Sequence, residues 1–189
     1  MRQEHAGMSN YNIPGVKTFE YTKIIGLENI EFGRDVLIDD FVFLSAKKKM
    51  RIGHHVHISC FTSITGGEEL TMGDFSGISQ GCRILTGSED FLHWGFGNPT
   101  VPEVFRNATR SPIHIGRFCV VGANSVVLPG VTIGEGATVG ACSVVTRDLD
   151  PWGVYIGNRR IAERNKKGVL ATYGKYCDEH GIQDISQAV

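Results

Sequence analysis

Apolar positions recur along this chain at a fixed interval that is not the interval of a helix. An apolar residue followed by glycine stands at Phe32, Ile52, Met72, Ile115 and Ile133, with steps of 20 residues between the first three and 18 between the last two. Within each unit an apolar side chain returns every six residues: Phe32, Ile38, Leu44; Ile52, Ile58, Ile64; Met72, Ile78, Ile84; Ile115, Val121, Val127; Ile133, Val139, Val145. A second, smaller side chain follows four residues after many of these: Val36, Val42, Val56, Thr62, Ser76, Cys82, Cys119, Ser125, Ala137, Ser143.

A six-residue period excludes helix for most of the chain, because a helical stripe needs apolar residues at i+3, i+4 and i+7. Three hexads predict an 18-residue coil of three short strands whose apolar side chains point inward. Such coils stack and pair with their neighbours, so stability accumulates along the stack. We place the two extra residues of the 20-residue coils at surface corners, near 47–49 and 66–69. A leucine-rich repeat has a similar period, but the leucine and asparagine spacing of that class is missing.

Two segments break the period. Residues 86–112 carry no hexad, and a loop this long inside a compact repeat is usually functional. After Gly157 the pattern turns helical, since Ile161, Leu170, Tyr173 and Cys177 can share one face. We therefore expect an irregular cap over residues 1–23, a β-helix over 24–158 with an excursion loop at 86–112, and a C-terminal helix and tail over 159–189.

The hexads carry a specific family resemblance. The run from Val131 to Ala141, followed by Ser143 to Asp148, closely resembles the hexapeptide-repeat acyltransferases, which include the galactoside, maltose and streptogramin acetyltransferases and many O-antigen-modifying enzymes. The resemblance covers roughly residues 24–160. It implies an all-β fold, a left-handed parallel β-helix, with acetyl-CoA as cosubstrate and a homotrimer in which the long loop packs against a neighbouring subunit. Periodicity alone does not give the handedness.

The resemblance favours an acetyl-CoA-dependent O-acetyltransferase that modifies a carbohydrate hydroxyl in surface-polysaccharide or lipopolysaccharide biosynthesis. The acceptor does not follow from the fold. An N-acetyltransferase of a nucleotide-linked amino sugar and a non-catalytic trimeric scaffold are the alternatives.

Acetyl transfer from a thioester needs a base, a donor for the oxyanion and a slot that aligns both substrates. In the family resembled, the base is a histidine just after the coil that precedes the loop, and alignment puts Asp90 at that position. His93 is the only histidine of the loop, and an imidazole, with an ordinary pKa of about 6.5, suits proton transfer near neutrality. We expect His93 to be the base, with Asp90 orienting it or acting in its place. The alternative is that His93 packs the loop and Asp90 caps a turn.

Other positions are assigned to the acceptor by the same resemblance. Ser59 aligns with a polar position that faces the acceptor in sugar acetyltransferases, and the alternative is an ordinary outward serine. Apart from the resemblance, we expect His57 and Trp94 to line the same cleft. The cluster His54, His55 and His57 invites comparison with the γ-class carbonic anhydrases, which share the fold, but their ligand spacing is absent. No metal is expected.

The resemblance also assigns residues to the cosubstrate. Small residues let the pantetheine arm lie close, and arginines pair strongly with phosphates. The expected contacts are Gly122, Ala123, Gly140, Ala141, Thr146, Arg147, Arg159, Arg160 and Arg164. The family's Gly-Asn-Pro-Ala turn reads Gly157-Asn158-Arg159-Arg160 here, so the phosphate partner stays open, and the arginines could instead belong to a solvated helix start.

The composition of the chain indicates which classes of partner and which cell compartment to expect. The net charge is −1 and the basic residues are scattered, so nothing indicates nucleic acid. The five cysteines show no C-x-x-C pair, which is typical of reduced thiols in a cytosolic protein. Neither a signal peptide nor a run of about 18 apolar residues occurs, so we expect a cytoplasmic protein without membrane insertion.

Overall fold

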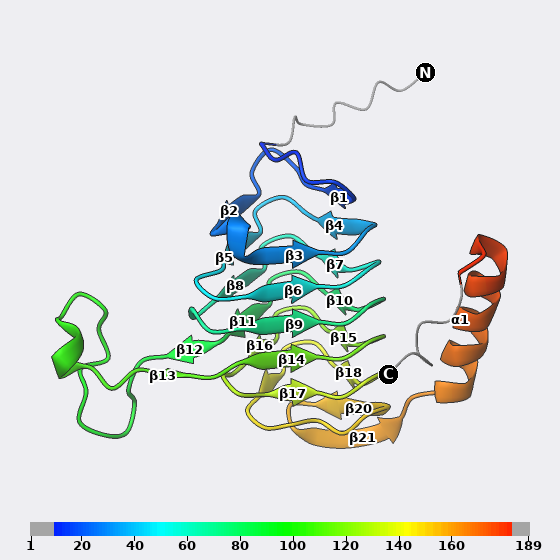
Figure 1. Cartoon of the computed structure of the whole chain (residues 1–189). Helices are drawn as coiled ribbons and strands as arrows, with labels where there is room; N and C mark the ends of the chain where they lie inside the picture. The colour runs from blue at the N-terminus through cyan, green and yellow to red at the C-terminus, as the bar shows by residue number, and fades with distance from the viewer. Residues whose placement is uncertain (1–9, 183–189) are drawn as a thin grey trace.

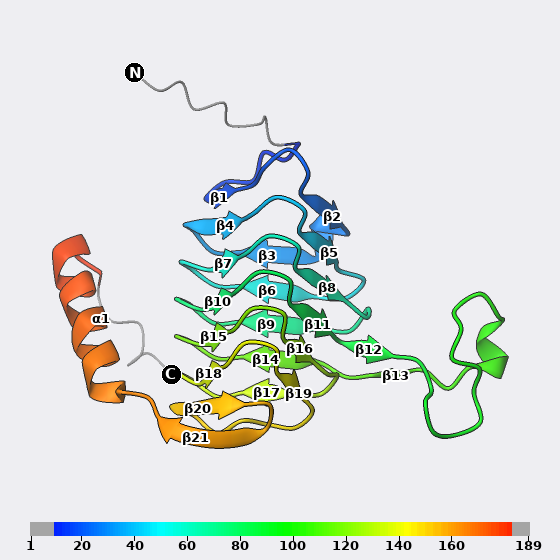
Figure 2. The ribbon, with the colours of Figure 1, turned by 180° about the vertical axis from the view of Figure 1, so that it is seen from behind.

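The chain forms a stack of three-sided coils with one arm and one helix outside the stack. The computed structural model describes residues 10–182. Figures 1 and 2 show parallel strands piled like rungs, with the arm that carries β12 and β13 on one side and α1 on the opposite side. The predicted parallel β-helix is confirmed.

Each side of the stack is a parallel sheet. The first face consists, in order, of β1 (Val16–Lys17), β4 (Val36–Ile38), β7 (His57–Ile58), β10 (Gly77–Ile78), β15 (Val120–Val121), β18 (Thr138–Val139), β20 (Gly153–Ile156) and the antiparallel β21 (Arg159–Glu163). The second face consists of β2 (Lys23–Ile25), β5 (Phe43–Ser45), β8 (Ser63–Thr65), β11 (Arg83–Leu85), β16 (Val126–Val127) and β19 (Val144–Val145). The third face consists of β3 (Ile30–Phe32), β6 (Met50–Ile52), β9 (Leu70–Met72), β14 (Ile113–Ile115) and β17 (Thr132–Ile133).

The core runs along the axis of the stack, where the hexad positions meet. Ile38, Ile58 and Ile78 pair in register on neighbouring strands and are at most 1% exposed. The smaller side chains four residues after the apolar ones are also buried. The hexad therefore fixes which side chains enter the core.

Buried thiols belong to this packing. Cys119 is fully buried, and burial raises its pKa to about 11. A thiol with such a pKa is protonated at neutral pH and is a poor nucleophile. All five cysteines are free.

The ends of the stack differ from the expected boundaries. β1 pairs with β4 at Val16, so the parallel ladder begins before residue 24. Residues 159–163 form β21, which turns back on β20 through Gly157 and Asn158, so the expectation that Ile161 lies on a helix is wrong. The positive φ of Gly157 suits a two-residue hairpin turn. The parts of the predicted cap and tail at 1–9 and 183–189 lie outside the described residues.

The predicted C-terminal helix exists as α1 (Lys166–His180). It begins at Asn165, whose side chain accepts a hydrogen bond from the Gly168 amide at 2.9 Å. Tyr173 and Tyr176 pack edge-on against Phe75 on a corner of the stack, and Cys177 is buried. Leu170 stays 37% exposed, so the helix docks mainly through its aromatic side chains.

Residues 86–112 form an arm that leaves the stack between β11 and β14. Its base is a short antiparallel pair, β12 (Gly87–Ser88) and β13 (Thr109–Arg110). The arm ends in a single turn of 3-10 helix, Glu103–Phe105, and projects away from the coils (Figure 1). The predicted excursion loop therefore has a defined conformation of its own.

Among residues 10–182, no helix is both long and apolar enough to cross a membrane.

Close stacking of the coils gives a first prediction about glycine. A Cβ added at Gly33 would lie 2.6 Å from backbone atoms of the next coil, at Gly53 and His54, whereas one added at Gly77 meets nothing nearer than a carbonyl oxygen at 4.0 Å. Overpacking of this kind costs about 1–3 kcal/mol, so Gly33→Ala should lower the melting temperature by about 2–12 °C. Gly77→Ala should leave it unchanged or raise it slightly. Equal melting temperatures for the two variants, measured by differential scanning fluorimetry, would contradict this account of the stacking.

Candidate active site

A hollow of about 280 Å³ opens on the first face, at strands β7 and β10. Glycine creates it: Gly77 pairs with His57 on one side and with Val120 on the other, and it places no side chain between them. The hollow is lined by His57, Ser59, Gly77, Ile78, Ser79, Gln80 and Val120. The structure therefore brings together His57 and Ser59, two of the three predicted acceptor residues.

Small and polar residues form a column at the edge of this face. The amides of Asp39, Ser59, Ser79, Gly122 and Gly140 each bond to the strand of the next coil, at 2.7–3.0 Å, from the position directly after an inward-facing residue. The hollow lies at Ser59 and Ser79, and the predicted pantetheine positions Gly122 and Gly140 follow in the next coils. A ligand in the hollow and one along these glycines would be neighbours.

A carboxylate that sequence analysis missed stands behind the hollow. Asp39 Oδ2 is 3.0 Å from His57 Nε2 and accepts a 3.0 Å hydrogen bond from Ser59 Oγ. The side chain of Asp39 is 25% exposed and that of His57 is 47% exposed. The sequence spacing could have placed Asp39 here, because Asp39, Ser59 and Ser79 are separated by 20 residues, which is the length of one coil.

Asp90 organises the arm. Its Oδ1 accepts hydrogen bonds from the amides of Leu92 and His93 at 2.8 and 2.7 Å, and its Oδ2 accepts from Gly95 N at 2.9 Å and Asn107 Nδ2 at 3.1 Å. These bonds, led by the His93 amide, hold the pKa of the Asp90 carboxyl well below its usual range.

This geometry gives Asp90 a different role from the predicted one. Four donors occupy the roughly four lone-pair sites of a carboxylate. The contact with His93 is made by its backbone amide and not by its imidazole. Asp90 is therefore suited to hold a turn, which is the alternative that the sequence left open for it.

A second acid of the arm is also structural. Glu89 pairs with Arg106 through both carboxylate oxygens, and this hydrogen bonding lowers the pKa of Glu89. The pair ties the two sides of the arm near its base, where both side chains are less than a quarter exposed.

The arm exposes apolar surface. Trp94 is 67% exposed and His93 is exposed beside it. Other large apolar side chains of the arm are exposed as well: Phe91, Leu92, Phe96, Val104 and Phe105. The arm that carries His93 and Trp94 points away from its own coils (Figure 2), whereas the hollow lies on the first face of the stack.

The predicted pantetheine residues adjoin one another on consecutive coils. Cys142 N donates to the carbonyl of Ala123 at 2.8 Å, and a Cβ on Gly122 would lie 2.6 Å from Ala141 N. Glycine at 122 is thus explained by coil stacking alone. The contacts of Gly122, Ala123, Gly140 and Ala141 with a cosubstrate stay a prediction.

Thr146 is held by Asn158, in the hairpin turn just before the predicted phosphate partners Arg159 and Arg160. Asn158 accepts from Thr146 N at 2.9 Å and donates to Thr146 Oγ1 at 2.6 Å. Arg159 follows Asn158 directly, while Arg160 pairs with Glu163 at 3.2 Å. Arg147 and Arg159 are exposed and offer their charge at this end of the stack.

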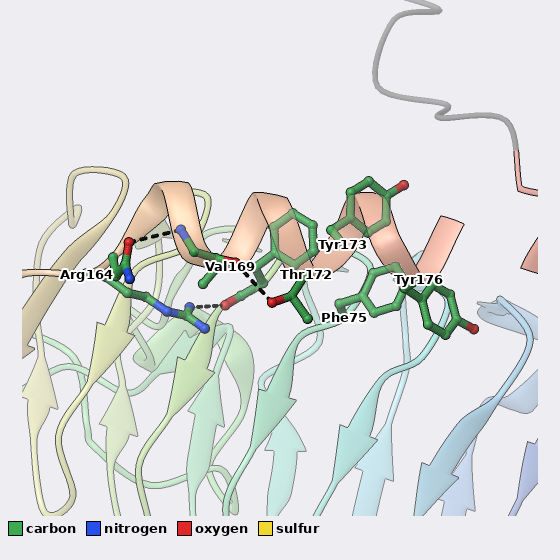
Figure 3. A pocket seen from close by; sticks show the side chains of 9 residues that line it. Phe75, Arg164, Val169, Thr172, Tyr173 and Tyr176 are labelled. Carbon is green, nitrogen blue, oxygen red and sulfur yellow. Dashed lines mark hydrogen bonds between the residues drawn. The ribbon is translucent and has the colours of Figure 1, made fainter. Parts of the chain in front are cut away.

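Arg164 lies elsewhere, under the start of α1. Its guanidinium donates to the carbonyls of Phe118 and Gly136. Figure 3 shows it at one end of an apolar groove between α1 and the stack, with Phe75, Tyr173 and Tyr176 at the other. This separates Arg164 from Arg159 and indicates a role in helix docking, and its contact with the cosubstrate phosphates stays a prediction.

The three neighbouring histidines have three different partners. His54 Nδ1 accepts from Arg34 N at 3.0 Å, His55 stacks on Phe75 with ring centroids 4.6 Å apart, and His57 faces Asp39. No group of three or more possible metal ligands occurs in the described part of the chain.

Known proteins similar to this chain are acyltransferases and acetyltransferases. Residues 112–147 match the family described as bacterial transferase hexapeptide (six repeats). The dTDP-4-amino-4,6-dideoxy-D-glucose acyltransferase of Escherichia coli is 35% identical over 155 residues, which is 80% of this chain and 81% of that protein. The putative colanic acid biosynthesis acetyltransferase WcaF of E. coli K12 is 32% identical over 143 residues, 76% of this chain and 73% of WcaF.

The solved structures similar to this chain include an acyltransferase as well. AntD, an N-acyltransferase from Bacillus cereus solved with dTDP and 3-hydroxybutyryl-CoA, superposes with a TM-score of 0.83 at 32% identity, covering 88% of this chain and 89% of AntD. A variant of AntD is solved with dTDP-4-amino-4,6-dideoxyglucose and coenzyme A, also at 0.83.

The four bonds at Asp90 predict how the arm responds to mutation and pH. Because the pKa of Asp90 in the folded chain lies below its ordinary value of about 3.9, the ionised carboxylate stabilises the arm fully above that pH, and the stabilisation is lost as pH falls further, through the lower pKa of the folded chain. Asp90→Asn should lower hydrogen-exchange protection in residues 86–112 by roughly tenfold, while the wild-type arm keeps its protection from pH 5 to 8. Asp148→Asn, which alters a carboxylate bonded to Thr132 N on another corner, is the control. Equal protection in the Asp90 variant and the wild type would refute the structural role.

Proposed function

Because this chain belongs to the hexapeptide-repeat transferase family, we propose that it transfers a short acyl group, acetyl first, from acyl-CoA to the amino group of a nucleotide-linked sugar. The sugar acyltransferase of E. coli and AntD support this acceptor, since both are similar over four fifths or more of this chain. The observation that carries the proposal is the hollow at Gly77, which adjoins the small-residue column at Gly122 and Gly140.

The reaction needs no covalent intermediate. The acceptor nitrogen attacks the thioester carbonyl carbon, a C–N bond forms, the C–S bond breaks and coenzyme A leaves as the thiol. His93 takes the proton that the nitrogen loses and returns it to the sulfur. The hollow holds the acceptor, and the column of small residues lets the pantetheine arm lie against the coils.

The site is proposed to be completed by a second copy of the chain. The arm that carries His93 and Trp94 points away from its own coils (Figure 2), and the apolar residues of the arm are exposed. A homotrimer with threefold symmetry places the same arm against the same face at each of three interfaces. The proposal keeps the cytoplasmic location expected from the reduced cysteines.

O-acylation of a sugar hydroxyl is the second candidate. WcaF, named for colanic acid biosynthesis, is similar over 76% of this chain and favours a role in surface polysaccharide. The non-catalytic scaffold is not retained, because the chain is similar to acyltransferases across both the hollow and the arm.

A thiol-release assay tests the function. Acetyl-CoA is incubated with the chain and either dTDP-4-amino-4,6-dideoxyglucose or the matching nucleotide sugar with a hydroxyl at that carbon. The proposal predicts coenzyme A release and an N-acetylated product with the amino sugar. Turnover with the hydroxyl sugar alone would favour the second candidate, and release with neither, nor with other amino or hydroxyl sugars, would contradict an acyltransferase of sugars.

Loss of the proposed base should slow turnover without weakening cosubstrate binding. A general base contributes about 10²–10⁴-fold, so His93→Ala should lower kcat by at least about two decades with little change in the KM for acetyl-CoA. Free imidazole should restore part of the rate. His114→Ala, at an exposed histidine of β14, is the control. Near-native kcat in folded His93→Ala would remove His93 from the mechanism.

Subunit complementation tests the shared site. Gly77→Val places a side chain in the hollow and should raise the acceptor KM at least tenfold, and the protein should still fold because a Cβ at this position meets nothing nearer than a carbonyl oxygen at 4.0 Å. When Gly77→Val and His93→Ala are unfolded and reassembled in equal amounts, about one interface in four pairs an intact hollow with an intact arm. About a quarter of wild-type activity should return. No recovery in mixed trimers would show that each chain uses its own arm.

A further inference from the structure

We propose that Asp39 is a positioning residue of the hollow, which fixes His57 and Ser59 so that they present hydrogen-bond acceptors to the N–H of an amino sugar. This inference rests on the proposed function and deepens it, because it makes the hollow selective for an amine over a hydroxyl.

The geometry starts with one carboxylate oxygen shared by two side chains. Asp39 follows β4 and Ser59 follows β7, so the stacking of coils brings them together on adjacent rungs. Both His57 Nε2 and Ser59 Oγ lie 3.0 Å from Asp39 Oδ2. Within residues 10–182, no lysine or arginine forms an ion pair with Asp39, so His57 and Ser59 are its partners at this oxygen.

The direction of these hydrogen bonds follows from the chemistry of a carboxylate. An ionised carboxylate only accepts, so Ser59 must donate its one hydroxyl proton to it. A neutral His57 ring must likewise carry its proton on Nε2 to bond to Asp39, and Nδ1 is then an acceptor. Of the side chains that line the hollow, His57 and Ser59 then offer lone pairs and no free proton.

An amine suits such a surface better than a hydroxyl does. A neutral amine has two N–H bonds, so one can point to the base while the other is held by His57 or Ser59. A hydroxyl has a single O–H, and once this proton faces the base, the oxygen lone pairs meet the lone pairs of His57 and Ser59. Polar groups that a bound ligand covers and leaves unpaired in this way weaken binding, which is the basis of selectivity.

The two neighbouring histidines show that this arrangement is particular to His57. His54 receives a backbone amide, and His55 lies between Phe75 and Tyr176 on the corner that docks α1. Neither lines the hollow.

Asp39→Asn tests the inference, because the amide keeps the shape of the carboxylate but can donate. The ¹⁵N spectrum of His57 should change from the Nε2–H tautomer in the wild type to the Nδ1–H tautomer in the variant. The kcat/KM for the amino-sugar nucleotide should fall about 10–100-fold, mostly through its KM, while the KM for acetyl-CoA stays unchanged. The preference for the amino sugar over its hydroxyl counterpart should fall at least tenfold.

Asp40→Asn is the matched control, since the next residue bears a carboxylate that accepts from Tyr21 N at 2.8 Å and does not line the hollow. It should leave the tautomer and the preference unchanged. His57→Gln should retain most of the preference, because its amide can donate to Asp39 and still offer an oxygen, whereas His57→Leu should lose it. If Asp39→Asn does not fold, this pair of His57 variants supplies the same comparison.

An unchanged tautomer and an unchanged preference in folded Asp39→Asn would overturn the inference, as would equal preference in the glutamine and leucine variants. If either result is found while the wild-type chain acylates the amino sugar, the inference about Asp39 is wrong but the proposed function is still supported. If the wild-type chain releases no coenzyme A with any sugar, the proposed function itself is contradicted.

Discussion

Stacking of one coil on the next is the constraint on which the rest of the structure depends. The inward side chains, such as Ile38, Ile58 and Ile78, are buried on neighbouring rungs and hold the parallel strands in register. Because side chains alternate across a strand, a fixed inward register also fixes the outward one. Residues separated by one coil therefore stand in columns on the surface. The polar and small side chains of the proposed site belong to two of these columns.

The columns explain how a repetitive fold makes a single site. Leu37, His57, Gly77 and Val120 occupy one outward column, and only Gly77 leaves a gap in it. The neighbouring column supplies Asp39 and Ser59 at the hollow and small residues in the coils that follow. The repeat therefore provides a rigid frame, and a few departures from the repeat provide the specificity.

Parts of this arrangement could be predicted from the sequence, and the reasons are physical. The hexads predicted the core because burial requires apolar side chains at inward positions, and the period fixes those positions. The hydrogen bonds of Asp39 were missed because outward residues show no periodic signal of their own, although the 20-residue spacing would place Asp39 beside Ser59. The interior of the arm was also beyond prediction, since the four donors around Asp90 come from the path of a loop. At the C-terminus, Gly157-Asn158 was a hairpin signal, and it outweighed the helical spacing of Ile161.

A crystal structure of the chain with coenzyme A and the amino-sugar nucleotide tests the central claim most directly. The account predicts that the sugar nitrogen lies in the hollow over Gly77, within about 3.2 Å of His57 or Ser59, and that the pantetheine arm follows Gly122 and Gly140. The arm of a second copy should bring His93 to the same nitrogen. A sugar bound away from the first face, or a pantetheine arm that avoids the small-residue column, would contradict the account.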